Sequence, residues 1–260
     1  MKLSAPTSGS RSVPRPFARR YDAIYADKDF GQDVTVFESL AGTAALAGKT
    51  VLEIGAGTGN HTLRLAQKVG KLVSVEIDAD FAAVLRAKLA VCAPENLRFF
   101  DRPVESLSET GFDAAVAFFH VVNYVGPDSA ASFLAALAAR LKPGAHFVAD
   151  LWNGSAALLD PPREEVRRKT AGTTQIVQHI RPRMDAARRT VTLNYEIALD
   201  EEDGREQFTE CIELYLWLRE ELASALQQAG FSDVTFWDYR LFPASARPDS
   251  WRLWLRAVRG

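Results

Sequence analysis

Short runs of apolar residues alternate with segments of helical periodicity over the first part of the chain. The runs predict buried strands, and in the segments between them apolar side chains recur every three or four positions, which predicts helices. The expected strands are 50–54, 71–77, 97–100, 112–119 and 145–151, and the expected helices are 34–47, 60–69, 80–89 and 129–141. Strands that are apolar throughout are buried on both faces, so the alternation predicts a parallel sheet covered by helices on each side.

The pattern changes after Trp152, where longer segments show partial alternation of apolar and polar residues. Segments 173–180, 189–198 and 207–218 are separated by polar turn residues, which predicts three antiparallel strands in a meander. A helix is expected over 219–229 because Gly230 provides a stop just past its end. Two final strands are expected at 234–240 and 251–258.

Composition and charge mainly exclude classes of protein and of binding site. The chain has 260 residues, 47% of them hydrophobic, and a formal net charge of -2, which is typical of a globular protein and gives no sign of nucleic-acid binding. The two cysteines, Cys92 and Cys211, match no metal or redox spacing, and the histidines show no ligand spacing, so we expect no metal. No apolar run approaches bilayer length, and the expected location is cytoplasmic, without membrane contact. The Ser-, Pro- and Arg-rich N-terminus is interpreted as a frayed tail, although its composition also suits a transit peptide.

Three glycines, Gly55, Gly57 and Gly59, lie between an expected strand and helix. Glycines there permit a tight turn and a close approach of the backbone to a ligand. Asn60 stands where a dinucleotide fingerprint would have its third glycine. Glu76 lies near the end of the next strand, where a carboxylate can accept hydrogen bonds from ribose hydroxyls. Glu76 alone does not separate a nicotinamide dinucleotide from S-adenosylmethionine (SAM), and it could also be a plain carboxylate at a strand end.

The Gly-x-Gly-x-Gly cluster after the first strand resembles that of class I SAM-dependent methyltransferases. The turn over 141–144, Leu-Lys-Pro-Gly, is also typical of this superfamily. The resemblance implies an α/β fold, a Rossmann-like seven-stranded methyltransferase sheet with the antiparallel β insertion as a lid, and SAM as cofactor. It further implies that Asp101 meets the adenine amine and that Glu53 approaches the methionine part of SAM. Both carboxylates could instead have only local structural roles.

The segment over 21–30, Tyr-Asp-Ala-Ile-Tyr-Ala-Asp-Lys-Asp-Phe, narrows the resemblance. It is similar to the N-terminal Tyr-Asp-x-x-Tyr…Lys-Asp-Tyr segment of small-molecule N-methyltransferases, especially the aminosugar N,N-dimethyltransferases. Further matches are Phe-His-Val-Val-Asn-Tyr over 119–124, Asp-Leu-Trp over 150–152 and Leu-Trp over 216–217. Two departures leave the acceptor open: Phe30 replaces a tyrosine, and residues 247–251 differ from the macrolide-pathway members.

The resemblance suggests a role for each candidate site residue. Tyr25, with Tyr21 beside it, would contact the carboxylate of SAM while its segment closes over the cofactor. Phe118 could supply an aromatic wall to the cationic donor, and His120 could take a proton from the acceptor or orient it. Tyr124 would contact the substrate, and Trp152 and Asn153 would line the acceptor side. The plainer alternative for the aromatic residues is core packing, and for His120 it is a loop histidine.

The sequence therefore predicts an enzyme that N-methylates an amino group of a small molecule. By its resemblance, the expected acceptor is a nucleotide-linked aminosugar of natural-product biosynthesis. O-methylation of a sugar hydroxyl, a SAM-binding module without chemistry, and a nucleotide-dependent oxidoreductase are the alternatives. A homodimer is compatible with the sequence. The expected organisation is a flexible tail over 1–16, a SAM-binding core over 17–151, a substrate-side insertion over 152–218 and the C-terminal part of the core over 219–260.

Overall fold

The computed structural model describes residues 13–42 and 46–260. Most of the expected flexible tail, and residues 43–45 of the expected helix over 34–47, therefore lie outside the described residues. Within the described part of the chain, no helix is long and apolar enough to cross a membrane.

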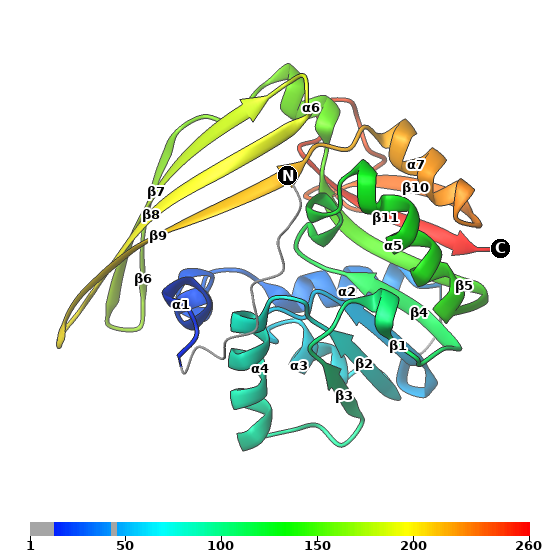
Figure 1. The fold of residues 1–260 in the computed structure, drawn as a ribbon, viewed down its shortest axis with the longest axis horizontal. Coiled ribbons are helices and arrows are strands. Elements are labelled where there is room, and N and C mark those ends of the chain that lie inside the picture. The colour runs from blue at the N-terminus through cyan, green and yellow to red at the C-terminus, as the bar shows by residue number, and fades with distance from the viewer. Residues whose placement is uncertain (1–12, 43–45) are drawn as a thin grey trace.

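A seven-stranded sheet forms the centre of the molecule, in the order β10-β11-β5-β4-β1-β2-β3 (Figure 1). Its strands are β1 (Thr50–Ile54), β2 (Lys71–Val75), β3 (Leu97–Phe100), β4 (Phe112–Ala117), β5 (Leu141–Trp152), β10 (Phe231–Asp238) and β11 (Arg252–Arg259). The first five strands pair in parallel, and β11 is antiparallel to both of its neighbours. The expected Rossmann-like seven-stranded sheet is confirmed. Because β1 lies between β2 and β4, the chain reverses its winding direction there, and the carboxyl ends of these strands form the edge where doubly wound folds bind ligands.

Helices cover both faces of this sheet. The helices of the described residues are α1 (Pro16–Ile24), α2 (Phe30–Leu40), α3 (Thr62–Ala66), α4 (Ala79–Val91), α5 (Pro127–Arg140), α6 (Gly154–Leu159) and α7 (Arg219–Gln228), with single 3₁₀ turns η1 (Leu46–Gly48), η2 (Val104–Ser106) and η3 (Val121–Tyr124). On one face, Leu134 of α5 and Leu226 of α7 pack against Leu52 and Phe147 of the sheet. On the other face, Phe37 of α2 packs with Val116. The two apolar layers explain why the central strands are apolar throughout.

A second, four-stranded antiparallel sheet stands beside the first, in the order β6-β7-β8-β9 (Figure 1). Its strands are β6 (Glu165–Ala171), β7 (Thr174–Asp185), β8 (Thr190–Glu201) and β9 (Gly204–Tyr215). The prediction of three strands was wrong by one, because β6 carries Arg-Arg-Lys over 167–169 and lacks an apolar pattern. As an edge strand it is largely exposed, so its pairing with β7 is not encoded in hydrophobic residues.

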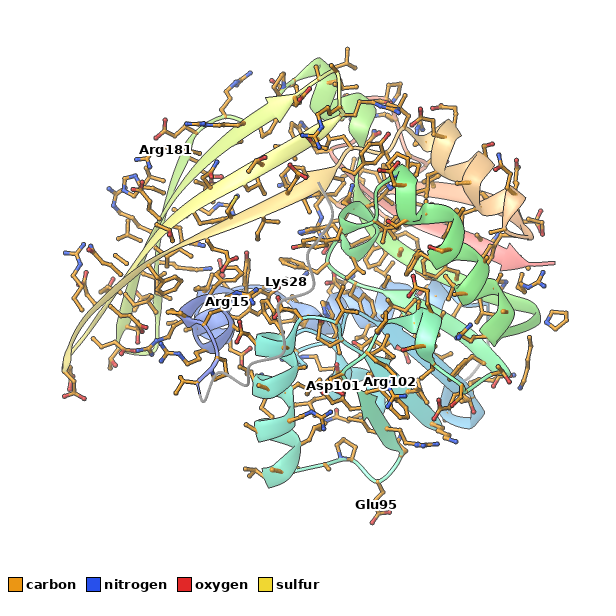
Figure 2. The ribbon with its side chains drawn as sticks, viewed as in Figure 1. Arg15, Lys28, Glu95, Asp101, Arg102 and Arg181 are labelled. Carbon is orange, nitrogen blue, oxygen red and sulfur yellow. The ribbon has the colours of Figure 1, made fainter. Side chains whose placement is uncertain are left out.

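Helix α1 lies between this second sheet and α4 (Figure 1). Phe17 and Ile24 of α1 are buried against Ile180 and Leu193 of the inner face of the sheet. Arg181, on the alternate face, points outward (Figure 2). We call the four-stranded sheet the lid sheet, because α1 joins it to the ligand-binding edge of the central sheet.

Helices α2 and α3 differ most from their expected bounds. Helix α2 begins at Phe30 rather than Val34, because the Asp29 side chain caps it by accepting a hydrogen bond from the Gln32 backbone N–H at 2.9 Å. Helix α3 is confined to Thr62–Ala66, shorter than the expected span over 60–69.

Candidate active site

The glycine loop follows β1 at the ligand-binding edge. Gly55, Gly57 and Gly59 all have positive φ angles, of 76°, 57° and 90°. A Cβ atom on Gly59 would lie 2.5 Å from Leu85 Cδ1, whereas a Cβ atom on Gly57 would meet no atom within 4 Å. The loop is therefore packed against the protein at Gly59 and open at Gly57. Such an opening beside bare backbone is what close approach of a nucleoside requires.

Glu76 follows β2 and lies directly beside the open part of the loop. Its side chain is 8% exposed, and it accepts hydrogen bonds from the backbone N–H groups of Gly57 at 2.7 Å and Asp78 at 2.8 Å. Burial raises the pKa of the Glu76 carboxyl. The expected partnership of the glycine loop and this carboxylate is therefore present in the geometry.

Asp101 lies at the matching position of the neighbouring strand. The Glu76 backbone N–H donates to the Phe100 carbonyl at 3.0 Å, so Asp101 follows β3 as Glu76 follows β2. Its carboxylate is half-exposed and forms an ion pair with Arg86 at 2.7 Å. This position is compatible with contact to a nucleoside base, and that contact stays a prediction.

Glu53 is placed differently, with a side chain only 1% exposed. Ser74 Oγ donates to Glu53 Oε2 at 2.7 Å. Burial raises the pKa of the Glu53 carboxyl to about 7. In this conformation the carboxyl is enclosed by neighbouring side chains and has no surface that a ligand could contact. Any effect of Glu53 on a bound cofactor would therefore be indirect.

The burial of Glu53 makes the stability of the fold depend on pH. An ordinary glutamate has a pKa of 4.5, whereas folded Glu53 holds its proton up to a pKa of about 7. The free energy of unfolding therefore falls as pH rises between these values, by about 3 kcal/mol at most. Glu53→Gln has no proton to lose, so we expect it to gain stability relative to the unsubstituted protein between pH 5 and pH 8. Urea unfolding at both pH values measures this difference, and an equal difference at both would contradict the assignment.

An aromatic cluster connects α1 to the end of β4. The ring of Tyr25, the residue that ends α1, lies 4.6 Å from the ring of Tyr21 and 5.2 Å from that of Phe119. Burial raises the pKa of both tyrosine hydroxyls well above the usual value, so both remain hydrogen-bond donors. Donors of this kind suit the carboxylate contact that was expected of them.

Asp22, between these tyrosines in sequence, ties α1 to the glycine loop. Its Oδ1 accepts hydrogen bonds from Thr58 Oγ1 at 2.6 Å and from Asn60 Nδ2 at 2.8 Å. Its Oδ2 forms an ion pair with Lys88 Nζ of α4 at 2.5 Å. Burial by itself would raise the pKa of Asp22, but the bonds from Lys88 and Thr58 outweigh it and lower the pKa. The sequence contained this aspartate in the Tyr-Asp motif but gave no sign of its partners.

Replacing Asp22 is expected to loosen α1 from the loop. Asp22→Asn removes the charge that strengthens its hydrogen bonds, so backbone amides of α1 should exchange with solvent about 10-fold faster, which corresponds to about 1.4 kcal/mol. Hydrogen exchange followed by mass spectrometry measures the change. Asp27→Asn is the matched control, because Asp27 pairs with Lys169 of the lid sheet at 2.5 Å and not with the glycine loop. Equal exchange rates in the two variants would show that Asp22 is not the tie.

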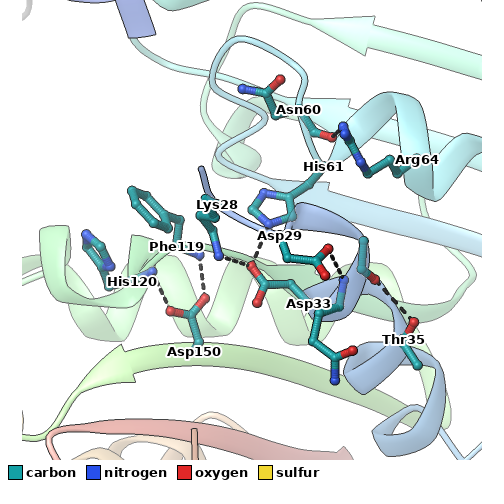
Figure 3. Close-up of polar contacts among 12 residues, drawn as sticks. Lys28, Asp29, Asp33, Thr35, Asn60, His61, Arg64, Phe119, His120 and Asp150 are labelled. Atoms are coloured by element: carbon teal, nitrogen blue, oxygen red, sulfur yellow. Dashed lines mark hydrogen bonds and ion pairs between the residues drawn. The ribbon is translucent and has the colours of Figure 1, made fainter. Parts of the chain in front are cut away.

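The chain leaves β4 through two successive residues with left-handed backbone. Phe119 has a φ angle of 63° and His120 one of 53°. This conformation costs about 1–2 kcal/mol for each residue other than glycine, so the surrounding structure has to stabilise it. The buried Asp150 carboxylate accepts hydrogen bonds from both backbone N–H groups (Figure 3). Arg252 forms an ion pair with this carboxylate at 2.6 Å. Strained residues held in this way are common at functional sites.

His120 is a neutral imidazole in these surroundings. Burial, with the charges of Arg252 and Lys28, lowers its pKa well below the usual 6.5. Its ring lies 6.4 Å from that of Tyr124 and 6.1 Å from that of Trp152. Among the residues that the structure describes, nothing hydrogen-bonds His120 Nδ1, although the atom is buried. A nitrogen in this state can accept a proton or a hydrogen bond from a bound molecule.

The other predicted site residues divide into two groups. Tyr124 is 44% exposed beside His120, and Trp152 is half-buried with its ring 5.8 Å from that of Trp251. Phe118, by contrast, is 2% exposed and stacks on the His61 ring at 4.3 Å. Phe118 therefore does not face the site, and we propose that the neighbouring Phe119 supplies the aromatic wall expected of it.

Asn153 is fully buried, and its polar atoms have structural partners. Its side chain caps α6 by accepting from the Ser155 backbone N–H at 3.2 Å, and it donates to the Ser250 carbonyl at 2.9 Å. The expected contact of Asn153 with an acceptor does not fit this arrangement, because its hydrogen-bonding groups face the protein.

A buried polar cluster lies under Phe119 and was not predicted (Figure 3). Asp33, 2% exposed, lies 2.5 Å from Lys28 Nζ and 2.8 Å from His61 Nε2, and it accepts from the Tyr239 hydroxyl at 2.5 Å. Burial by itself would raise the pKa of Asp33, but the contacts with His61 and Lys28 outweigh it and lower the pKa to about 2. Lys28 Nζ also lies 5.2 Å from the centre of the Phe119 ring. The cluster anchors the segment between α1 and α2 beneath the site.

The comparisons with known proteins agree with this geometry. Residues 51–144, which include the glycine loop and Glu76, match the family model described as a methyltransferase domain. Residues 51–144 therefore form a methyltransferase domain. Its cofactor is SAM, and the open backbone at Gly57 beside the Glu76 carboxylate fits the nucleoside of that molecule.

Solved structures show the same fold over most of the chain. The SAM-bound amino pentose methyltransferase CalS10 from Micromonospora echinaspora is 19% identical, with a TM-score of 0.72 over 92% of this chain and 96% of that one. DesVI from Streptomyces venezuelae is 17% identical, with a TM-score of 0.76 over 95% of this chain and 99% of that one. At these identities the likeness establishes the fold, including the lid sheet.

Curated relatives match a smaller part of the methyltransferase. The ribosomal RNA small subunit methyltransferase A of Anaeromyxobacter dehalogenans (strain 2CP-C) is 43% identical over 81 residues, which are 29% of this chain and 28% of that protein. A probable dimethyladenosine transferase of Drosophila melanogaster is 41% identical over 71 residues, 25% of this chain and 23% of that protein. The chain thus matches about a quarter of the length of these relatives.

Proposed function

We propose that this protein transfers a methyl group from SAM to an amino nitrogen of a small molecule, with a nucleotide-linked aminosugar as the preferred acceptor class. The observation that carries the proposal is the neutral imidazole of His120, whose buried Nδ1 has no partner among the described residues. The fold of an amino pentose methyltransferase over 92% of the chain supports the acceptor class. A homodimer is part of the same proposal and would be measured separately by light scattering.

The residues that would hold SAM surround the ligand-binding edge. The backbone at Gly57 would approach the nucleoside, Glu76 would accept from the ribose hydroxyls, and Asp101 would meet the adenine amine. Tyr25 and Tyr21 would donate to the carboxylate of the methionine part. When bound, SAM supplies a methyl group attached to a positively charged sulfur. The sulfur keeps the electron pair of the carbon–sulfur bond as the methyl group moves to the acceptor nitrogen, so the donor needs no activation by the protein. The protein contributes mainly by holding the acceptor in line, which can be worth about 7–11 kcal/mol.

His120 would then accept the proton that the acceptor amine has to lose. An amine is mostly protonated in water and has to lose one proton before its lone pair can attack. Burial among aromatic rings disfavours the ammonium and lowers its pKa, so a neutral imidazole of low pKa can still accept the proton at Nδ1. A hydroxyl is far less acidic, and an imidazole of low pKa is a poor base for it. The low pKa of His120 therefore favours an amine over a hydroxyl acceptor.

The ribosomal RNA relatives suggest a second acceptor, the adenine amine of a folded RNA. We favour a small molecule, because RNA binding usually needs an excess of positive charge and this chain has a formal net charge of -2.

Incubation with SAM and matched acceptors tests the proposal. UDP-glucosamine and UDP-glucose differ at a single position, where the first has an amine and the second a hydroxyl. Mass spectrometry should show one or two added methyl groups on UDP-glucosamine and none on UDP-glucose. Methylation of UDP-glucose alone would establish the O-methyltransferase alternative, and methylation of an adenosine-containing RNA hairpin alone would establish the RNA alternative.

Two further results would overturn the proposal in other ways. SAM binding without S-adenosylhomocysteine formation from a broad library of amines and sugars would indicate a binding module. A fluorescence titration that favours NADH over SAM would indicate an oxidoreductase.

A further inference from the structure

We propose that Asp150 is a positioning residue of this site, which holds His120 in the orientation that its chemistry needs. The inference rests on the proposed role of His120. It concerns a contact within the chain, so it can be tested whether or not the acceptor has been identified.

The position of Asp150 follows from the pairing of β4 with β5. Ala117, the last residue of β4, pairs with Ala149, so the next residue of β5 lies beside the point where the chain leaves β4. The Asp150 side chain is fully buried there. Its Oδ1 accepts from the Phe119 backbone N–H, and its Oδ2 accepts from the His120 backbone N–H at 3.2 Å (Figure 3).

These two bonds select the left-handed conformation of Phe119 and His120. Residues with a Cβ atom avoid positive φ unless something compensates, and glycine would adopt it freely. In place of glycine, the chain has two residues with aromatic rings at these positions, and both rings lie at the site. The Phe119 ring faces Tyr25, and the His120 ring lies near Tyr124 and Trp152. Without the carboxylate, the backbone would favour negative φ, and both rings would leave these positions.

Arg252 holds the Asp150 carboxylate in place. Its Nη2 lies 2.6 Å from Asp150 Oδ2, and its guanidinium stacks on the Tyr239 ring with 3.7 Å to the ring centre. Despite burial, Asp150 raises the pKa of Arg252, so the cation persists. The charged groups that act on His120 are Arg252, Lys28 and Asp33. A change in the orientation of His120 should therefore change its titration.

Asp150→Asn tests the proposal through the His120 ring, followed by NMR of ¹⁵N-labelled histidine during a pH titration. In the unsubstituted protein the His120 ring should stay neutral well below pH 6.5. In Asp150→Asn we expect its pKa to rise towards the ordinary value, because the ring is released towards solvent. Asp113→Asn is the matched control: Asp113 also accepts from a backbone N–H, that of Thr50 at 2.9 Å, and pairs with a cation, Lys142 at 2.7 Å, but at the opposite edge of the sheet.

A second variant separates positioning from folding. Phe119→Gly/Asp150→Asn places a residue that tolerates positive φ next to His120, so it should restore part of the low pKa of His120. If Asp150→Asn alone does not fold, a folded double variant supports the proposal and an unfolded one overturns it. An unchanged His120 titration in a folded Asp150→Asn protein also overturns it.

Turnover of UDP-glucosamine gives an additional readout. We expect kcat to fall about 100-fold in Asp150→Asn, with the SAM dissociation constant changed by less than about 3-fold, since a misplaced base affects proton transfer more than cofactor binding. If the unsubstituted protein methylates no amine, the proposed function fails, whereas the NMR titration still decides the role of Asp150.

Discussion

Gly57→Val is expected to reduce SAM binding by at least about 100-fold, which corresponds to about 2.7 kcal/mol. Gly57 has a φ angle of 57°, and the space beside its α-carbon is open. A valine would fill the space into which the nucleoside has to fit. It would also strain the backbone whose N–H bonds Glu76. Isothermal titration calorimetry with SAM measures the loss.

Gly144→Val is the control for this prediction. Gly144 also has a positive φ angle, of 78°, and a Cβ atom there would meet no atom within 4 Å, but it lies in the first part of β5, away from the ligand-binding edge. The two variants should lose similar free energy of unfolding, and only Gly57→Val should lose SAM. Equal SAM affinity in both variants would contradict the assignment of the glycine loop.

His120→Ala is expected to lower kcat on an amine acceptor by about 100-fold, at the low end of the range for general acid–base catalysis. Water or the substrate itself can remove the proton of an ammonium, so some activity should remain. A hydroxyl acceptor depends far more on a base, so an O-methyltransferase would lose all activity. Total loss of turnover on UDP-glucosamine would therefore count against N-methylation.

His179→Ala is the control for His120→Ala. His179 lies on β7, where it alternates with the buried residues Gln178 and Ile180, so it belongs to the outer face of the lid sheet. Its replacement should leave kcat unchanged. A similar loss in both variants would mean that the effect comes from stability and not from the site.

The sequence predicted the central sheet well, because a buried parallel strand needs a continuous apolar run. Strands β1 and β3 have the expected bounds, and α7 begins at the expected residue and ends before Gly230. Strand β6 was missed because an exposed edge strand needs no apolar pattern. The lid sheet was expected, but the apolar pattern gave no indication that α1 packs between it and α4.

The site was predicted where it depends on local sequence. The glycine loop and Glu76 follow adjacent strands, so the fold alone brings them together. Phe118 was expected to face the ligand from the end of its strand, but β4 ends at Ala117, and two left-handed residues turn Phe119 towards the site instead. Asp150 was noted only as part of the Asp-Leu-Trp match, without a role, and Asp33 was missed. The partners of both are distant in sequence, and no pattern along the chain indicates such contacts.

A crystal structure of this protein soaked with SAM would test the central claim most directly. We predict that the nucleoside lies above the glycine loop at 55–59, with its ribose hydroxyls on the Glu76 carboxylate. SAM bound elsewhere, or NADH in that position with SAM excluded, would contradict it.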